Sequence, residues 1–317
     1  MKIDVIIPVY RPGRELFSLL DQLECQTVPV QDIILMNTEK EYFERLVQDV
    51  DFAGRYPNVK VWHILKKEFD HGGTRHQGVL HSKADIFLTM TQDALPADDR
   101  LVEELTKHLS GQVAVAYARQ LPLADCRETE RASREFNYPP VSSVKTAADL
   151  ERLGVKTFFC SNVCAAYRRD IYNELGGFIR HTIFNEDMIY AAGAVKAGYG
   201  IAYEAQARVF HSHNYTNMQQ LRRNFDLGVS QADHPEIFAG IPSESEGKKL
   251  VRETYLHLRD RKKTYLFPAF CIQCAYKYMG YLLGKHYKKL SRKWILRITM
   301  NRDYWSRRFR SGLARRQ

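Results

Sequence analysis

Apolar and polar positions alternate in a regular order through the first 120 residues. Five short, largely apolar runs have the pattern of buried strands: Ile3–Tyr10, Ile33–Met36, Val59–Leu65, Ile86–Met90 and Val113–Tyr117. Helical patterns lie between them, the clearest in Glu15–Gln26, where leucines recur on one helix face. Strands and helices that alternate in this way predict an α/β fold with a mostly parallel sheet flanked by helices.

The second part of the chain is less regular. Arg119–Lys156 has no clear period and contains Pro139–Pro140, so we expect an excursion or a loop there. Regular patterns return further on, as strands at Thr157–Tyr167 and Ile201–His211 and as helices at Arg169–Leu175, Asn185–Ala197 and Asn217–Ser230. Beyond about Ser243 we find no strand pattern, which predicts a helical C-terminal region.

Composition narrows the class of protein. With 44% hydrophobic and 12% aromatic residues, the 317-residue chain is expected to be globular rather than disordered. No window has the ~18 uninterrupted apolar residues of a membrane-spanning helix, and the best candidate, Thr264–Gly284, is interrupted by Pro268 and Lys277. Six cysteines without a secretory signal indicate reduced thiols in a cytosol. No second cysteine pair stands at zinc-finger spacing from Cys271 and Cys274.

The net charge of +10 is concentrated near the C-terminus. Lys285–Gln317 contains twelve Lys or Arg residues against one acid, Asp303, so the rest of the chain is close to neutral. Trp294 lies among these bases, and aromatic residues beside a dense cationic face suit a helix on an anionic membrane surface. A helical hairpin packed on the rest of the chain would explain the same pattern. No recognisable nucleic-acid-binding motif accompanies the bases, so we expect no nucleic-acid partner.

An apolar stripe precedes these bases. Its members recur at helical spacing: Phe270, Cys271, Cys274, Tyr278, Tyr281 and Leu282. The other side of the same helix is expected to hold Lys277, Gly280, Gly284 and Lys288.

A carboxylate stands directly after the fourth strand. Asp93 follows the buried run Ile86–Met90, and open α/β sheets place ligand chemistry at the carboxyl ends of their strands. Mg²⁺ prefers carboxylate and phosphate oxygens, so one or two Asp residues can hold a cation against a nucleotide diphosphate. Asp93 could equally cap the turn before Leu95–Pro96.

Two further candidates lie at the ends of strands. Tyr10, in the segment Pro8-Val9-Tyr10-Arg11, can stack on a planar base, and exposed backbone groups there can hydrogen-bond to the edge of the base. The loop Phe69–Gly78 has two adjacent glycines for close backbone approach, and Arg75 is suited to a phosphate or a carboxylate. The loop is neither a Rossmann fingerprint nor a P-loop, and a turn that only caps a helix is the alternative.

Acids and histidines complete the set of candidates. Glu186 and Asp187 begin a predicted helix, where they could be ordinary partners of the helix dipole. One of them could instead remove a proton from an acceptor hydroxyl. His211 and His213 end a predicted strand, where an imidazole could complete a metal shell or be structural.

The order of five motifs resembles the inverting glycosyltransferases of family 2, most closely their bacterial rhamnosyltransferase branch. The motifs are IPVY, FDHGGTRHQG, TQDALP, NED and VFHSHNYT, and the match covers about residues 1–224. The resemblance implies a GT-A fold, in which a nucleotide half precedes an acceptor half. It also implies a deoxythymidine-diphosphate-rhamnose (dTDP-rhamnose) donor and a divalent cation, Mg²⁺ or Mn²⁺. Rhamnose would be transferred to a growing polysaccharide or lipid-linked glycan in cell-surface polysaccharide synthesis.

The same resemblance implies roles for individual residues. The implied donor-binding residues are Pro8, Val9, Tyr10, Arg11, Thr38, Asp70, Gly73, Arg75 and Gln92. The implied metal-binding residues are Asp93, His211 and His213. Asp187 corresponds to the general base, with Glu186 beside it. The implied reaction is a direct displacement at the anomeric carbon that inverts its configuration.

The chain departs from the family pattern at three places. After the second strand an acidic D-x-S/G pattern is usual, whereas residues 36–39 read MNTE. The metal-binding motif is reduced to QDA at residues 92–94, and His76 stands where an Asn is common. These departures leave open a UDP-hexose or UDP-N-acetylhexosamine donor, and also a non-catalytic membrane scaffold with a degenerate transferase domain. A sugar-nucleotide pyrophosphorylase is disfavoured, since only RPGR follows the first strand.

We therefore expect a catalytic domain over residues 1–240, with a nucleotide-sugar half at 1–118 and an acceptor half at 157–240. Residues 241–317 are expected to form a helical, basic extension that associates with membrane. The expected location is cytoplasmic, peripheral on the inner face of the plasma membrane.

Overall fold

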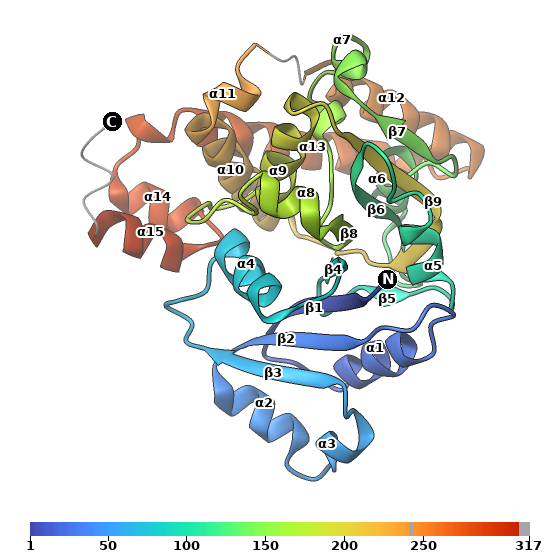
Figure 1. Ribbon diagram of the computed structural model, residues 1–317. Coiled ribbons are helices and arrows are strands. Elements are labelled where there is room, and N and C mark those ends of the chain that lie inside the picture. The colour runs from blue at the N-terminus through green and yellow to red at the C-terminus, as the bar shows by residue number, and fades with distance from the viewer. Residues whose placement is uncertain (241–243, 311–317) are drawn as a thin grey trace. The chain divides into compact units, whose positions relative to one another are not determined.

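Four strands near the N-terminus form the parallel half of one sheet. The computed structural model describes residues 1–240 and 244–310. The four strands are β1 (Ile3–Tyr10), β2 (Asp32–Thr38), β3 (Val59–Ile64) and β4 (Ile86–Met90). They lie in the order β3-β2-β1-β4, all parallel, as Figure 1 shows for the blue strands. The parallel α/β arrangement predicted from the alternating pattern is confirmed here.

Helices cover both faces of this half of the sheet, because the side chains of β1 point alternately to the two faces and are apolar on both. The helices are α1 (Glu15–Glu24), α2 (Lys40–Val47), α3 (Phe52–Arg55) and α4 (His71–His81). Val5 and Ile7 share a core with the leucines of α1, whereas Ile6 faces α4. A Cβ added at Gly78 of α4 would lie 2.4 Å from Ile6, so α4 approaches the sheet at a residue without a side chain.

The other half of the sheet is mixed. Its strands are β5 (Leu95–Pro96), β6 (Val113–Leu121), β7 (Ser143–Lys145), β8 (Cys164–Arg168) and β9 (Gly200–Phe210). β8 lies between β4 and β6 and is antiparallel to both, and β9 is parallel to β6. β5 and β7 both pair antiparallel with β9. The sheet is therefore parallel where the strand–helix alternation was clearest and mixed beyond it.

Two sequence predictions are wrong in this region. The strand expected at Thr157–Tyr167 begins only at Cys164, and Gly154–Phe158 form a 3-10 helix. Arg119–Lys156, expected to lack regular structure, contains α6 (Glu128–Asn137), β7, a 3-10 turn at Ala147–Asp149 and α7 (Leu150–Leu153). The elements there are short, and α6 is mostly polar, so no hydrophobic period reveals them.

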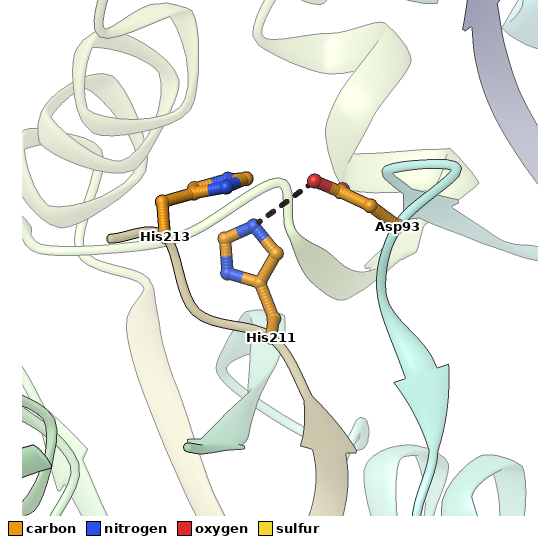
Figure 2. A group of neighbouring side chains, drawn as sticks. All are labelled: Asp93, His211 and His213. Atoms are coloured by element: carbon orange, nitrogen blue, oxygen red, sulfur yellow. Dashed lines mark ion pairs between the residues drawn. The ribbon is translucent and has the colours of Figure 1, made fainter. Parts of the chain in front are cut away.

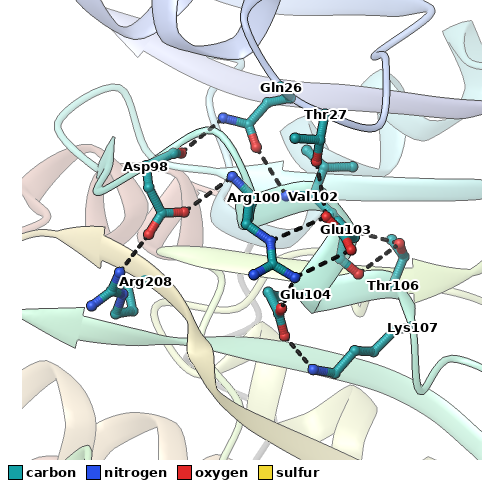
Figure 3. Close-up of polar contacts among 10 residues, drawn as sticks. All are labelled: Gln26, Thr27, Asp98, Arg100, Val102, Glu103, Glu104, Thr106, Lys107 and Arg208. Carbon is teal, nitrogen blue, oxygen red and sulfur yellow. Dashed lines mark hydrogen bonds and ion pairs between the residues drawn. The ribbon is translucent and has the colours of Figure 1, made fainter.

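The segment that follows β4 is fixed by polar contacts around α5 (Leu101–Thr106), which Figure 3 shows. Gln26 donates to the backbone oxygen of Asp98 at 3.0 Å and accepts from the N–H of Val102 at 3.0 Å. The Asp98 carboxylate accepts from Arg208 of β9 at 2.6 Å. These bonds join the end of α1, the start of α5 and β9, and they hold the chain directly after Asp93.

The remaining helices are α8 (Arg169–Glu174), α9 (Glu186–Lys196), α10 (Asn217–Asp233), α11 (Pro235–Phe238), α12 (Glu244–Asp260), α13 (Phe267–Lys285), α14 (Arg292–Ile298) and α15 (Arg302–Arg310). Thr264–Leu266 and Tyr287–Lys289 are 3-10 helices. No helix in the described ranges is long and apolar enough to cross a membrane.

The chain forms two compact units. We call them the sheet unit (Met1–Asp125, Asn137–Arg180 and Glu186–Ser212) and the helical unit (Cys126–Phe136, His181–Asn185 and the described residues from His213 onward). The division into domains predicted at residue 240 stays a prediction. Ser243, where the helical region was expected to begin, lies outside the described residues.

Glycines bring α10 and α13 together in the helical unit. A Cβ at Gly280 would lie 2.1 Å from the backbone oxygen of Leu221, and one at Gly284 would lie 2.1 Å from that of Phe225. Gly228 of α10 meets α13 equally closely, because its Cβ would lie 2.4 Å from the oxygen of Tyr281. The sequence predicted Gly280 and Gly284 on the side of this helix opposite the apolar stripe, and it did not predict that this side would be packed. Both are buried in the helix contact.

The basic C-terminal helices pack into the helical unit. Ile295, Ile298 and Trp305 share a core with Phe225 and Val229 of α10. The buried Asp226 carboxylate accepts hydrogen bonds from the Thr299 hydroxyl at 2.6 Å and from the N–H of Met300 at 2.9 Å. Arg308 forms an ion pair with Asp233 at the end of α10. The bases at Arg315 and Arg316 lie outside the described residues.

The glycine contact makes a stability prediction. We expect Gly284→Ala to lower the free energy of unfolding by about 1–3 kcal/mol, because a methyl group has no room against the backbone of α10. The matched control is Gly193→Ala in α9, where an added Cβ has no atom within 4 Å. Removal of an exposed helical glycine should raise stability by about 0.5–1 kcal/mol. Urea denaturation checks both values. A Gly284→Ala protein as stable as the parent would contradict the tight contact.

Candidate functional site

An aromatic and cationic group lies at the carboxyl end of β1. The rings of Tyr10 and Tyr42 meet edge to face at 5.7 Å, and the Arg11 guanidinium lies 5.2 Å and 5.0 Å from their centres. Arg11 also donates to the Tyr42 hydroxyl at 3.0 Å. The half-buried Tyr10 ring and the exposed Arg11 can still meet a ligand. Pro8 is half-buried in β1, and the Val9 side chain lies in the core, so Val9 can offer a ligand only its backbone.

Gln92 has a structural role at this edge. Its side chain accepts from the N–H of Tyr10 at 2.8 Å and donates to the carbonyl of Tyr10 at 3.0 Å, which ties the end of β4 to the end of β1. The backbone groups of Tyr10, predicted to be exposed for a base, are therefore occupied. That part of the sequence prediction is wrong.

Thr38 lies beside Tyr10 in the register of the sheet. Its side chain is buried, and its hydroxyl makes no hydrogen bond within the described part of the chain. The Oδ1 atom of the preceding Asn37 is likewise unbonded, while its Nδ2 contacts His63 at 2.9 Å. A buried polar atom without a partner is costly, so both atoms are suited to bind a ligand. Asn37 was not among the predicted site residues.

The glycine-rich loop begins a helix. Asp70 is the N-cap of α4, and its carboxylate accepts from the N–H of Gly73 at 2.7 Å. Thr74 in turn accepts from the N–H of Asp70 at 3.1 Å. A Cβ at Gly72 would lie 1.9 Å from the carbonyl of Ile179, so only glycine fits there. The structure thus gives Asp70 and Gly73 the capping role that the sequence had left as the alternative.

Arg75 of α4 and Glu186 of α9 form a buried ion pair. Their charged atoms are 2.9 Å apart, and each side chain is 7% exposed. Arg75 also donates to the carbonyl of His71 at 3.0 Å. Burial raises the pKa of the Glu186 carboxyl, but the charges of Arg75 and His71 lower it by more than burial raises it. The net shift of the pKa is therefore downward. Glu186 is therefore held as a carboxylate and Arg75 is committed to it.

Asp187 has the opposite electrostatic environment. Its carboxylate accepts from the N–H of Asn162 at 3.0 Å and from the N–H of Met188 at 2.8 Å. Burial and then the neighbouring Glu186 carboxylate raise the pKa of Asp187 above its ordinary value. The side chain remains partly exposed, so a ligand can reach it. A reachable carboxylate with a raised pKa is suited to proton transfer.

Asn162 joins both acids to the sheet, a role that sequence reasoning missed. Its side chain donates to Glu186 at 3.1 Å and accepts from Thr89 and Tyr167 at 2.6 Å and 2.7 Å. Its backbone holds Asp187. The only signal in the sequence is the polar pair Ser161 and Asn162 within the otherwise apolar stretch Phe158–Tyr167.

Asp93, His211 and His213 gather at the ends of β4 and β9, as Figure 2 shows. Their ligand atoms all lie within 4.8 Å of one another, and Nε2 of His211 is 3.7 Å from the Asp93 carboxylate. His213 is only two residues beyond His211 in the same segment. A carboxylate and two imidazoles are ligands for divalent metals, so the three residues can hold a divalent cation. The sequence had predicted this group.

Gln120 orients His211. Its amide donates to the Tyr138 and Ser161 hydroxyls at 2.6 Å and 2.9 Å, which leaves its oxygen to face Nδ1 of His211 at 2.9 Å. An amide oxygen can only accept, so Nδ1 carries the proton and Nε2 presents its lone pair towards Asp93. This arrangement fits a metal-binding histidine. Nothing in the sequence marked Gln120.

The two groups of candidates are linked through one backbone contact. The N–H of Thr91, two residues before Asp93, donates to the carbonyl of Val163 at 3.1 Å, and Val163 follows the Asn162 that holds Asp187. The structure thus joins the metal-binding candidates and the acid pair to the same strand ends. Arg75, predicted to bind the donor, instead forms an ion pair with Glu186.

Comparisons with known proteins agree on the class of enzyme. Residues 4–176 match the family described as Glycosyl transferase family 2. The chain is 37% identical over 311 residues to the O-antigen chain rhamnosyltransferase RfbN of Salmonella typhimurium, covering 96% of each protein. It is 34% identical over 308 residues to the O-antigen chain rhamnosyltransferase WbaN of Salmonella anatum, covering 95% of each.

Solved structures share the fold at low identity. A mannosyltransferase of Pyrobaculum calidifontis, solved in complex with GDP-Man and Mn²⁺, superposes with a TM-score of 0.55 at 16% identity over 100% of this chain and 88% of its own. S. aureus TarS 1-349 gives 0.50 at 13% identity over 91% and 92%. The GT-A fold implied by the motifs is therefore confirmed, and the family match and the near-full-length identities show that the chain belongs to glycosyl transferase family 2 and is a glycosyltransferase.

Proposed function

We propose that this enzyme transfers L-rhamnose from dTDP-rhamnose to a hydroxyl group of an O-antigen glycan, with inversion at the anomeric carbon. The observation that carries the proposal is identity of 37% and 34% to two O-antigen rhamnosyltransferases over about 95% of the chain. The family match ends at residue 176, whereas this identity extends into both compact units. Asp187 and Asp93 would then act in residues 1–240, the predicted catalytic domain.

Asp187 is the proposed general base. Its raised pKa brings its proton affinity closer to that of a base that works near neutral pH, and as a partly exposed residue it can accept the proton of an acceptor hydroxyl. Glu186 is paired with Arg75 and is a weaker base, so we assign it the role of raising the pKa of Asp187. The acceptor oxygen attacks the anomeric carbon as the bond to the diphosphate breaks.

The donor would lie along the carboxyl ends of β1 and β2. Tyr10 offers a ring face to the base, and the unbonded hydroxyl of Thr38, which lies beside Tyr10 in the sheet register, can pair with its edge. The Arg11 guanidinium supplies positive charge nearby. Asp93, His211 and His213 would hold Mg²⁺ or Mn²⁺, which supplies charge neutralisation for a leaving diphosphate.

The acceptor is proposed to be lipid-linked and the enzyme to work peripherally at the inner face of the plasma membrane. Lys288, Lys289, Arg292 and Lys293 are exposed, and Trp294 in the first turn of α14 is 57% exposed. Exposed bases beside an exposed indole suit an anionic lipid surface. The packed hairpin and the membrane surface are compatible, because α14 buries Ile295 and Ile298 while these side chains stay outside.

The role of Asp187 is tested by Asp187→Asn. We expect donor binding to persist and the transfer rate to fall by roughly 10²-fold or more, the usual contribution of a general base. In the parent, the rate should rise with pH as Asp187 loses its proton, at a higher pH than an ordinary Asp would give. Asp170→Asn, which alters an exposed acid of α8, is the matched control and should not change the rate. Turnover retained in Asp187→Asn would assign the base elsewhere.

Donor identity and the metal site are tested together by calorimetry. Binding of dTDP-rhamnose should be tighter with Mn²⁺ than with a chelator and tighter than that of UDP-glucose or UDP-N-acetylglucosamine. Asp93→Ala should weaken binding about tenfold or more with Mn²⁺, because a charged ligand is lost, and should have no effect in chelator. Asp99→Ala, an exposed acid nearby, is the control.

Each result decides a separate point. An equal loss in Mn²⁺ and in chelator would show that Asp93 does not bind the metal. Preference for a UDP-sugar would keep the enzyme class and discard rhamnose as the transferred sugar. Absence of binding to every donor would favour a non-catalytic scaffold.

Membrane association is tested by sedimentation with anionic vesicles. Replacement of Lys288, Lys289, Arg292 and Lys293 by Gln should weaken binding roughly a hundredfold or more, since each base near the surface contributes about 1 kcal/mol. The control replaces four exposed bases of the sheet unit by Gln: Lys2, Arg14, Arg45 and Lys83. Equal binding by the two variants would refute a specific role of the basic tail.

A further inference from the structure

The helical unit contains a cavity of about 460 Å³ between three of its own segments. The start of α6, the start of α10 and the first turns of α13 line it. A cavity of this size lies within the range that holds small ligands. Arg127, Glu128, Thr129 and Asn217 give it a polar end, and α13 with Leu266 gives it an apolar wall.

Positive charge dominates the polar end. Glu128 is the only acid that lines the cavity in the described part of the chain, and its carboxylate accepts from Lys263, Arg261 and His257 at 2.6 Å, 2.7 Å and 2.8 Å. Glu135 neutralises part of the positive charge of these bases, since its carboxylate lies 3.1 Å from Nδ1 of His257. The Glu128 charge is therefore already neutralised.

Arg127 is different from these bases. Its backbone N–H donates to the Asn214 side chain at 2.9 Å, which fixes the main chain. Its exposed guanidinium has no hydrogen bond or ion pair with any residue that the structure describes. An unpaired guanidinium beside the Thr129 hydroxyl and the Asn217 amide is a set of groups suited to phosphate.

The apolar wall continues out of the cavity along α13. Ala269 and Ile272 line the cavity, and Met279 follows Ile272 after seven residues, two helical turns on, on the same side of the helix. Ile272 is 54% exposed and Met279 is 45% exposed. No exposed residue of α13, which is described over its whole length, is charged. From Ala269 to Leu282 this uncharged face is about 20 Å long.

A long uncharged face with one cation at its end has the chemistry of an amphiphile-binding site. Exposed apolar surface of this extent marks an interaction site, and a hydrocarbon chain needs no polar partners along it. Asn217 is four residues beyond His213, so the segment that carries a metal-binding candidate also forms a wall of the cavity.

We propose that the cavity and the exposed face of α13 bind one lipid phosphate. The phosphate lies between Arg127, Thr129 and Asn217, and the hydrocarbon chain lies over Ile272 and Met279. The identification of this lipid as the carrier of the sugar acceptor rests on the proposed function, whereas the lipid site itself does not. The site takes a single lipid molecule and differs from the basic surface near α14.

The test is binding of farnesyl phosphate to the full chain, measured by calorimetry with farnesol and inorganic phosphate as comparison ligands. Farnesyl phosphate should bind at least tenfold more tightly than either, because only it has both a phosphate and an apolar chain. Arg127→Gln and Ile272→Gln should each weaken this binding about tenfold. Arg302→Gln and Met300→Gln, which alter an exposed base and an exposed apolar residue of the same unit, should leave it unchanged.

Three results would overturn the proposal: equal affinity for inorganic phosphate, no loss in Arg127→Gln and Ile272→Gln, or an equal loss in the two control variants. A parent dimer that Ile272→Gln dissociates in sedimentation would instead assign the face to a second copy. Unchanged thermal melting shows that a variant is folded. Binding of farnesyl phosphate without binding of dTDP-rhamnose would reject the proposed function and keep the lipid site. Transfer to a water-soluble glycan without binding of farnesyl phosphate would reject the lipid site and keep the proposed function.

Discussion

The geometry of the candidate active site depends on the hydrogen bonds of one buried asparagine. The Asn162 amide oxygen is held by two hydroxyls, from Thr89 of β4 and Tyr167 of β8. Since an amide has donors on one side and acceptors on the other, these bonds turn its N–H group towards Glu186. The position of the acids at the start of α9 is thereby set by the antiparallel pairing of β4 and β8.

That constraint gives two adjacent carboxylates opposite properties. Glu186 faces Arg75 and stays charged, and its charge in turn raises the proton affinity of Asp187. Pairs of titratable groups whose surroundings push their pKa values apart commonly divide acid and base roles between them. In the proposed mechanism, Arg75 acts on the reaction through Glu186. The charge of Glu186 in this ion pair raises the pKa of the neighbouring Asp187. Loss of either Arg75 or Glu186 would leave the other charge buried without a partner.

The sequence predicted the elements with a strong period and the residues at their ends. β1 to β4 and the proximity of the metal-binding candidates Asp93, His211 and His213 were predicted because polar residues directly follow apolar strands. Strand β8 was placed too early, since Phe158 and Phe159 extend the apolar pattern although Phe158 belongs to a 3-10 helix.

Other features left no trace in the hydrophobic pattern. Asn162 and Gln120 act through networks of hydrogen bonds, and isolated polar residues in a strand region produce no period in the sequence. The helix contact at Gly280 and Gly284 was not predicted because a glycine has no side chain to count as apolar, although its small size is what allows the contact. The basic C-terminal helices α14 and α15 bury Ile295 and Trp305, and the net charge of this segment gave no indication of that packing.

The contact between α10 and the last helices has a consequence for folding during synthesis. Phe225 of α10 and Trp305 of α15 share one core but stand 80 residues apart in the chain. At a rate of about 5–20 residues per second, the ribosome needs roughly 4–16 s to make that interval. The apolar side of α10 therefore stays without its partners for seconds, long enough for a chaperone or another nascent chain to meet it.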